Sequence, residues 1–497
     1  MNPYPRVDDV DVLIVGAGIS GIGIAVTLST ERPSTSFLML EARAASGGTW
    51  DLFRYPGVRS DSDLHTFGYA FKPWRERESI ASGARILAYL RETVTENGLD
   101  EHIRYGQRVV GADWSSSRAR WSVEVEDVAS GERRLVTAGW LYCATGYYRY
   151  DAGHTPAFAG RDRFRGRIVH PQQWPEDLDH AGRRVVVIGS GATAVTLAPA
   201  LAETAGHVTM LQRTPGYVLP VAAVDRGALR MRRWFGEKRG YALTRHKNIA
   251  IQRALWLFCR RFPTTARRRI RRIVQRQLPD GYPVDEHFNP PYDPWDQRLC
   301  IVPDGDLFAA IRYGDLTVVT DRITTFTETG VQLASGRELE ADLIVTATGL
   351  NLRMLGGISL RVDGRKVSPG DTVVYRGLML SGVPNLALAF GYTNASWTLK
   401  IGELAGYFCR LLAHLDANGF DTARPIADLE MATHPLIDLA GGYVRRSVDE
   451  LPKQGEAGPW RSSTGYAEDV RLLRHGHVVD QFLHLSGPAD REQTADS

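Results

Sequence analysis

The fold is decided by residues 11–21, which read DVLIVGAGISG. The aliphatic run predicts a short buried strand, and the glycines that follow it have the spacing GxGxxG. Gly16 permits a tight turn, Gly18 lets the backbone approach a pyrophosphate, and Gly21 lets the next helix pack on the strand. The free N–H groups at the start of that helix, from Ile19 and Ser20 onward, would face the anion. The stretch therefore predicts a dinucleotide-binding turn.

The residues after this turn favour FAD as the dinucleotide. A second predicted strand, Phe37–Leu40, ends in Glu41, about 20 residues beyond Gly18, where an acid accepts the hydroxyl groups of a ribose. Gly47 and Gly48 would allow close approach of the backbone beside a second phosphate. Together with the position near the N-terminus, these features predict FAD contacts at Glu41, Gly48, Thr49 and Trp50.

A second glycine turn follows at residues 184–194, RVVVIGSGATA, with alanine in place of the last glycine. That exchange is a permitted variant of the same turn. The next predicted strand, Val208–Leu211, leads to Arg213 and Thr214, where the first unit has Glu41. A guanidinium pairs with a 2′-phosphate and an acid repels it, so the sequence predicts NADP. The expected contacts are Gly189, Ser190, Gly191, Ala192, Thr193, Ala194, Arg213 and Thr214.

Three buried strands, Val12–Val15, Val185–Ile188 and Leu343–Thr346, alternate with helical patterns. This alternation predicts an α/β fold with two Rossmann-like dinucleotide-binding domains and a helical insertion. The segments Cys143–Tyr147 and Thr346–Gly349 would cross between the domains. We expect an FAD-binding domain in two parts (1–147 and 354–497), a linker and NADP-binding domain in two parts (148–218 and 296–353), and the helical insertion at 219–295.

Composition excludes several classes of protein. A chain of 497 residues with 43% hydrophobic and 24% charged residues and a net charge of +3 is typical of a soluble globular protein, and we expect no nucleic-acid partner. We find no apolar run of transmembrane length and no apolar signal region, and therefore expect a cytoplasmic protein. The cysteines Cys143, Cys259, Cys300 and Cys409 form neither a disulfide framework nor the redox-active pair of a flavin disulfide reductase. We expect no metal site.

Residues 226–276 are strongly basic, because Glu237 is their only acid. A helical layer with one solvated face is the simpler interpretation, and a surface for anionic lipid, such as a weak peripheral membrane contact, or for nucleic acid is the alternative. The apolar residues interleaved with the arginines are expected to form the buried side of that layer: Trp234, Phe235, Leu255, Trp256, Leu257 and Phe258.

The linker before the second turn is the most specific motif. Residues 164–175 read FRGRIVHPQQWP and match the pattern FxGxxxHxxxWP through Phe164, Gly166, His170, Trp174 and Pro175. On these residues the chain resembles the type I Baeyer–Villiger monooxygenases, a group of class B flavoprotein monooxygenases. It is most similar to their ethionamide-activating branch. In this pattern His170 is expected to organise the linker between the domains.

The resemblance implies a site and a reaction. It assigns Arg298 as the catalytic arginine and Asp61 as the aspartate that orients it. NADPH would reduce FAD, and the flavin would form a C4a-peroxyflavin with O2 and insert one oxygen atom beside the carbonyl of a small hydrophobic ketone, giving an ester or lactone. Oxidation of sulfur or nitrogen centres remains the alternative. Family members often have lysine before the arginine, so Gln297 leaves the selection of NADP mainly to Arg213.

The remaining expected contacts lie in loops. Gly349 would lie beside a cofactor, and Tyr392, Asn394 and Trp397 would approach the flavin.

Overall fold

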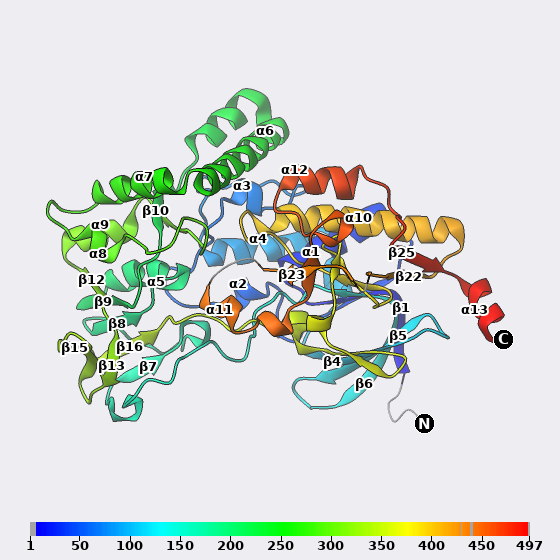
Figure 1. Ribbon diagram of the computed structural model, residues 1–497, viewed down its shortest axis with the longest axis horizontal. Helices are drawn as coiled ribbons and strands as arrows, with labels where there is room; N and C mark the ends of the chain where they lie inside the picture. Colours follow the sequence, from blue (N-terminus) through cyan, green and yellow to red (C-terminus); the bar gives the residue numbers. More distant parts are fainter. Residues whose placement is uncertain (1–5, 429, 438–440, 496–497) are drawn as a thin grey trace.

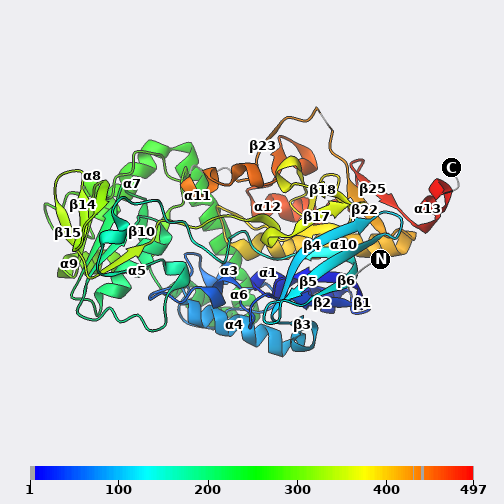
Figure 2. The ribbon, with the colours of Figure 1, turned by 90° about the horizontal axis from the view of Figure 1, so that it is seen from below.

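The computed structural model describes residues 6–428, 430–437 and 441–495. Two sheets of the nucleotide-binding type lie side by side along the long axis of the molecule, and a long helix, α6, stands above them (Figure 1). The view from below separates the same two halves (Figure 2). The predicted α/β class is confirmed.

The first sheet is built around the N-terminal strand. Its order is β18-β17-β4-β5-β6-β1-β2-β3, and β21 pairs with the end of β6. The strands β1, β2, β3 and the second half of β6 are parallel, whereas β4, β5 and β6 form an antiparallel meander. The strands are β1 (Arg6–Val15), β2 (Phe37–Leu40), β3 (Ile103–Arg104), β4 (Gln107–Ser115), β5 (Arg120–Asp127), β6 (Arg133–Cys143), β17 (Ser359–Val362), β18 (Arg365–Val367) and β21 (Leu386–Leu388).

Three helices cover one face of the first sheet: α1 (Ile19–Glu31), α4 (Gly83–Glu96) and α10 (Trp397–Asn418). They bury a core that includes Ile22, Leu90 and Phe408, each inaccessible to solvent. Burial of one large apolar side chain contributes about 1.5–3 kcal/mol, so this core adds substantially to the stability of the first half. Short helices α2 (Thr49–Leu52) and α3 (Leu64–Phe67) follow the first glycine turn.

The second sheet is fully parallel, with the order β12-β9-β8-β16-β7. Counted from β8, this is the order of a Rossmann unit. The elements are β7 (Arg167–Val169), β8 (Arg184–Ile188), α5 (Ala192–Ala202), β9 (His207–Gln212), α9 (Asp306–Tyr313), β12 (Leu316–Thr320) and β16 (Leu343–Thr346). A small antiparallel sheet is added beside it by β13 (Ile323–Phe326), β14 (Gly330–Leu333) and β15 (Glu338–Glu340).

The segment between these strands holds α6 (Arg226–Arg261), α7 (Pro263–Gln275) and α8 (Val284–His287), framed by the parallel pair β10 (Val218–Val221) and β11 (Cys300–Pro303). Three residues of β10 lie inside the predicted insertion, which we expected to lack strands. The strand escaped notice because its four residues include Pro220, which cannot donate a ladder hydrogen bond.

The prediction for the apolar residues of this segment is partly wrong. Trp234, Phe235 and Leu257 are 71%, 51% and 46% exposed, whereas Leu255, Trp256 and Phe258 are half-buried. For Trp234 and Phe235 the reason is a break in α6 at Gly236, whose φ of +73° is not helical. The helix turns back on itself there, so the residues just before the break lie at a tip and contact no core.

After the second sheet the chain returns to the first through β17, β18, β21 and α10. The remaining elements are β19 (Val374–Tyr375), β20 (Met379–Leu380), β22 (Thr422–Pro425), β23 (Thr433–Pro435), α11 (Gly442–Arg445), β24 (Lys453–Gly455), α12 (Tyr466–Asp469), β25 (Leu483–Ser486) and α13 (Pro488–Ala495). No helix among the described residues is both long and apolar enough to cross a membrane. Each of the four cysteines is free and buried.

Candidate functional site

The first glycine turn has no room for side chains. Gly16 has a φ of +105°, and a Cβ there would lie 2.7 Å from the carbonyl oxygen of Ala144. A Cβ on Gly21 would lie 1.9 Å from the oxygen of Gly16, and one on Gly48 would lie 3.0 Å from the Cα of Gly18. Bare backbone from two loops therefore meets at the start of α1. This is the cradle that a pyrophosphate group requires, so the residues present fit a dinucleotide.

Glu41 lies directly beneath this turn. Its side chain is buried, and its carboxylate accepts hydrogen bonds from the N–H groups of Ala17 (2.8 Å) and Arg43 (2.9 Å). Burial raises the pKa of Glu41, and the two backbone hydrogen bonds act in the opposite direction. The acid thus stands at the end of β2, at the position that a ribose-binding residue takes in such folds. Thr49, on the neighbouring loop, lies 3.2 Å from the hydroxyl of Tyr150.

The second turn differs from the first in a way that explains its alanine. Gly189 has a φ of +148°, and a Cβ there would lie 2.3 Å from the oxygen of Ala347 but 3.4 Å from the Cβ of Ala194. Ala194 is fully buried between helix and turn, so the second turn has room for a methyl group where a Cβ on Gly21 of the first turn would clash. A Cβ on Gly191 would meet no atom within 4 Å, so the surface in front of α5 is open.

Arg213 follows β9 at the edge of this open surface. It is exposed, and no ion pair of its side chain is found among residues 6–428, 430–437 and 441–495. The adjacent residue is tied to the turn, because the Ser190 hydroxyl donates to the carbonyl oxygen of Thr214 (2.8 Å). The second turn and a free guanidinium are thus brought together, an arrangement suited to a 2′-phosphate.

The linker motif fixes the segments that connect the two halves through contacts of His170. His170 lies with Nε2 3.1 Å from the carbonyl oxygen of Gly349, and its Nδ1 accepts from the N–H of Gln172 (3.1 Å). Because Nδ1 is an acceptor, the neutral tautomer with a proton on Nε2 fits this site. Desolvation lowers the pKa of His170. A Cβ on Gly153 would lie 2.0 Å from the imidazole, so a third segment packs directly on the ring.

The other motif residues pack the second sheet. Phe164 is buried, and a Cβ on Gly166 would lie 2.5 Å from its ring. Trp174 packs half-buried against the core around β8 and α5. Pro175 accepts a turn hydrogen bond from Leu178. The motif therefore stabilises this part of the fold through packing and through the hydrogen bonds of His170.

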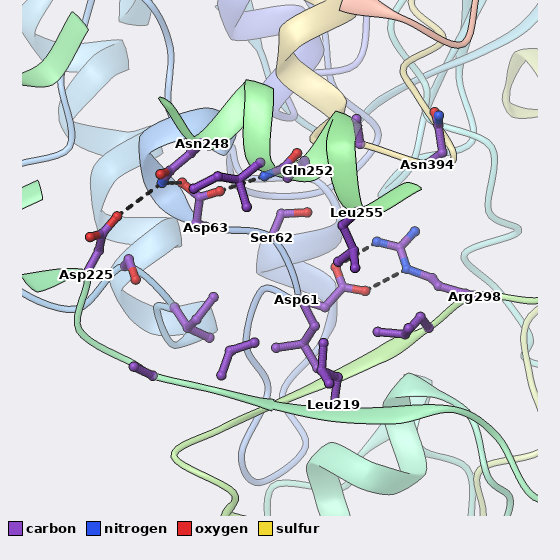
Figure 3. A pocket seen from close by; sticks show the side chains of 18 of the residues that line it. Asp61, Ser62, Asp63, Leu219, Asp225, Asn248, Gln252, Leu255, Arg298 and Asn394 are labelled. Carbon is purple, nitrogen blue, oxygen red and sulfur yellow. Dashed lines mark hydrogen bonds and ion pairs between the residues drawn. The ribbon is translucent and has the colours of Figure 1, made fainter. Parts of the chain in front are cut away.

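Arg298 and Asp61 meet across 237 residues of sequence (Figure 3). Nε of the arginine donates to one carboxylate oxygen at 2.6 Å, and Nη2 donates to the other at 2.7 Å. The charge of Asp61 raises the pKa of Arg298 further above its ordinary value. Within the described residues Nη1 has no hydrogen-bond partner, and the side chain is 37% exposed toward a pocket. A fixed positive charge thus faces a cavity.

This pocket has a volume of about 640 Å³. Asp61 and Ser62 come from the loop before α3, Asn248 and Leu255 from α6, and Asn394 from the loop before α10 (Figure 3). The walls are mainly aliphatic: Leu219, Val221, Val224, Ile251, Leu255 and Ile301. A cavity of this size and lining suits an apolar organic substrate.

One side of the pocket is polar. The carboxylate of Asp63 accepts from Nδ2 of Asn248 (2.9 Å) and from Nε2 of Gln252 (2.7 Å) (Figure 3). Asp225 accepts from Lys247 (2.7 Å) and more distantly from Asn248 (3.4 Å). These hydrogen bonds hold α6 in place over the loop, and the buried Oε1 of Gln252 has no hydrogen-bond partner among the described residues. The sequence analysis missed them because they come from segments that only the fold brings together.

The three loop residues that we expected near a flavin lie in three different places in the structure. Asn394 lines the pocket. Trp397 donates from Nε1 to the Ser20 hydroxyl (2.9 Å), beside the first glycine turn, and stacks on Tyr147 at 5.3 Å between ring centroids. Tyr392 instead donates to Asp469 in a buried cluster behind the loop, where Lys400 lies 5.2 Å from its ring centre.

Tyr147 and Trp295 are two further residues of the site that the sequence analysis did not assign. Tyr147 shares a 3.0 Å hydroxyl contact with Tyr148, and burial raises its pKa. Trp295 lines the pocket with a φ of +76°, a strained conformation for a tryptophan, three residues before Arg298. Neither residue belongs to a motif that would have singled it out.

Comparisons with known families and proteins agree on one class of protein, the flavin-binding monooxygenases. Residues 78–355 match the model of the flavin-binding monooxygenase-like family, and residues 14–76 match an NAD(P)-binding Rossmann-like domain. The chain is 50% identical to the FAD-containing monooxygenase EthA of Mycobacterium tuberculosis, covering 96% of this chain and 98% of EthA. It is also 50% identical to MymA of the same organism, covering 98% and 99%.

Solved structures share the fold. A steroid monooxygenase bound to NADP superposes with a TM-score of 0.74 at 24% identity, covering 96% of this chain and 100% of the other. Cyclohexanone monooxygenase with bound ε-caprolactone superposes with a TM-score of 0.73 at 21% identity, covering 97% and 100%. These likenesses establish the α/β architecture with its nucleotide-binding sheets.

Proposed function

Because the chain belongs to the flavin-binding monooxygenase-like family, in the EthA branch with the Baeyer–Villiger fold, we propose that it oxygenates ketones. The proposed reaction inserts one oxygen atom of O2 beside the carbonyl carbon and gives an ester or lactone. The single observation that carries the proposal is the Arg298–Asp61 pair at the wall of an apolar pocket.

FAD and NADP(H) are the cofactors. The cradle of Gly16, Gly18 and Gly48 with Glu41 would hold FAD, and the open turn at Gly191 with Arg213 would hold NADP. When bound, the pair supplies the electrons and the activation of O2 that side chains lack. The named relative EthA contains FAD, and the steroid monooxygenase structure contains NADP.

Arg298 would stabilise negative charge that develops on oxygen during the transfer. A guanidinium remains protonated at any working pH, and its pKa is raised further by Asp61. Asp61 occupies two of its nitrogens in a fork and so fixes the orientation of the third. The aliphatic walls exclude water, which strengthens the electrostatic interaction. Removal of such a donor from an oxyanion site costs about 10²–10³-fold in rate.

Oxidation of sulfur or nitrogen is the second candidate, since the family model extends to monooxygenases in general. A soft heteroatom needs no stabilisation of a carbonyl adduct, so its oxidation would depend less on Arg298. This difference provides the test.

We expect Arg298→Ala to lose ketone oxygenation by about 10²–10³-fold while still binding FAD and oxidising NADPH. Product analysis with one hydrophobic ketone and one thioether of similar size would measure this, using Arg298→Lys as the charge-retaining control. Ester formation at the wild-type rate by Arg298→Ala would contradict the assignment. Thioether oxidation without any ester from the wild-type enzyme would favour the second candidate.

A further inference from the structure

The bent helix α6 carries an exposed aromatic tip. Its two arms, residues 226–235 and 237–261, fold back at Gly236, and they stand above the rest of the molecule (Figure 1). Trp234 is 71% exposed and Phe235 51% exposed immediately before the bend. Two exposed aromatic side chains on a projecting bend cost solvation free energy and contribute no packing to the fold.

The bend is a rigid feature. A Cβ on Gly240 would lie 2.7 Å from the Cα of Arg232, so the two arms touch through their backbones. Arg232 donates to Glu237 across the bend (2.8 Å) and to the carbonyl oxygen of Arg75 (2.7 Å). The tip is therefore held in one place relative to the first sheet.

Basic residues surround the aromatic pair. Arg230, Arg233, Lys238 and Arg239 are exposed, and none of the four makes an ion pair or side-chain hydrogen bond within the part of the chain that the structure describes. Glu237, the acid nearest the tip, is already paired with Arg232. The surface around the tip thus has four uncompensated positive charges next to two aromatic rings.

The exposed apolar surface continues toward the pocket. Leu243 (44% exposed) and Ile251 (57% exposed) lie on the second arm, and Ile251 also lines the pocket that Arg298 faces. The mouth of that pocket therefore opens on the same helix that carries the tip.

We propose that this surface, the α6 tip, docks on an anionic lipid bilayer. Tryptophan and phenylalanine partition into the headgroup region, and each Lys or Arg near an anionic surface adds attraction that salt screens. The charges on the tip match an anionic membrane, whereas a second copy of this chain would bring the same positive charges together. The proposal concerns binding alone and does not depend on the reaction.

The test is co-sedimentation of the FAD-loaded protein with vesicles of phosphatidylcholine, with and without about one-third phosphatidylglycerol. We expect binding to the anionic vesicles that weakens as NaCl rises. Trp234→Ser with Phe235→Ser should weaken this binding about tenfold or more. Replacing Arg230, Arg233, Lys238 and Arg239 by Gln should abolish the preference for anionic lipid.

The matched control replaces four exposed arginines that lie away from α6 and, among the described residues, make no ion pair or side-chain hydrogen bond: Arg161, Arg163, Arg337 and Arg361. It should bind vesicles nearly as well as the wild type. Equal binding by the tip variants and the control would overturn the proposal. So would failure of the wild type to bind, or a dimer in sedimentation velocity that dissociates only in the Trp234→Ser, Phe235→Ser variant.

Discussion

At the scale of residues, the two glycine turns are distinguished by one charge. The strand after the first turn ends in Glu41, which is buried and held by two backbone N–H groups. The strand after the second turn ends at exposed Arg213. An exposed guanidinium that makes no ion pair among the described residues retains its capacity to bind a phosphate, and we therefore propose FAD for the first turn and NADP for the second.

Arg213→Ala should therefore raise the KM for NADPH and leave the KM for NADH nearly unchanged. The ratio between them should shift about tenfold or more, the usual effect of one charge-assisted hydrogen bond. Steady-state oxidation of both nucleotides by the FAD-loaded enzyme measures it, and Arg337→Ala serves as an exposed control. An unchanged ratio would move the 2′-phosphate contact to another residue.

The sequence predicts residues well where local geometry decides their place. Gly16, Gly18, Gly21 and Gly189 are needed by turns whose shape follows from a few neighbours, and the structure puts them in such turns. Contacts such as Asp63 with Gln252, or Trp397 with Ser20, join segments far apart in sequence. No spacing rule predicts such pairs, because their distance depends on the packing of whole domains.

At the scale of elements, the linker connects both halves through one imidazole. His170 binds the backbone at Gly349 and has Gly153 against its ring. Since burial lowers the pKa of His170, the folded protein favours the neutral form. Between this lowered pKa and the unfolded value of about 6.5, only the unfolded chain binds the proton. The contribution to stability is complete above about pH 6.5 and is lost as the pH falls through the folded pKa.

His170→Gln should keep a donor near Nε2 and remove this titration. We expect its thermal unfolding temperature to fall less between about pH 7.5 and 5.5 than that of the wild type. Differential scanning calorimetry over this range measures the two slopes. His65, His154 and His287 also have lowered pKa values and are present in both proteins, and of these three His154 also lowers the pKa of His170 by its charge. Parallel slopes would show that His170 does not titrate on unfolding.

Helix α6 shows where element-level prediction from sequence was wrong. The interleaved arginines and aromatic residues indicated a helical layer with one solvated face and one buried side. The break at Gly236 rotates the first arm away from that side, so Trp234 and Phe235 become exposed. A single glycine in a helical pattern rarely ends it, because its cost is only about 1 kcal/mol.

At the scale of the whole molecule, the thiol groups of all four cysteines are buried. Cys143, Cys300 and Cys409 lie in three different packing regions, and burial raises the pKa of each to about 12. Burial also raises the pKa of Cys259. Burial disfavours the reactive thiolate and blocks access of a reagent, so reaction with a thiol reagent requires the molecule to open.

We expect a disulfide-exchange reagent at about pH 8 to label none of the four cysteines rapidly in the folded protein. In denaturing guanidinium chloride it should label all four, since each is free. The absorbance of the released thiolate gives both counts. Rapid labelling of the folded protein, or fewer than four thiols after denaturation, would contradict the packing described above.

The division of the first sheet between distant segments also matters while the chain is being synthesised. The last residues of β6, Leu141–Cys143, pair with β21, which begins about 240 residues later. At roughly 5–20 residues per second, the ribosome needs about 12–50 s to supply that strand. All strands of the second sheet lie between Arg167 and Thr346 and emerge earlier. A nascent chain thus contains all strands of the second sheet while the end of β6 beside the first glycine turn still lacks its partner β21. We expect chaperones to bind the nascent chain at this unpaired edge.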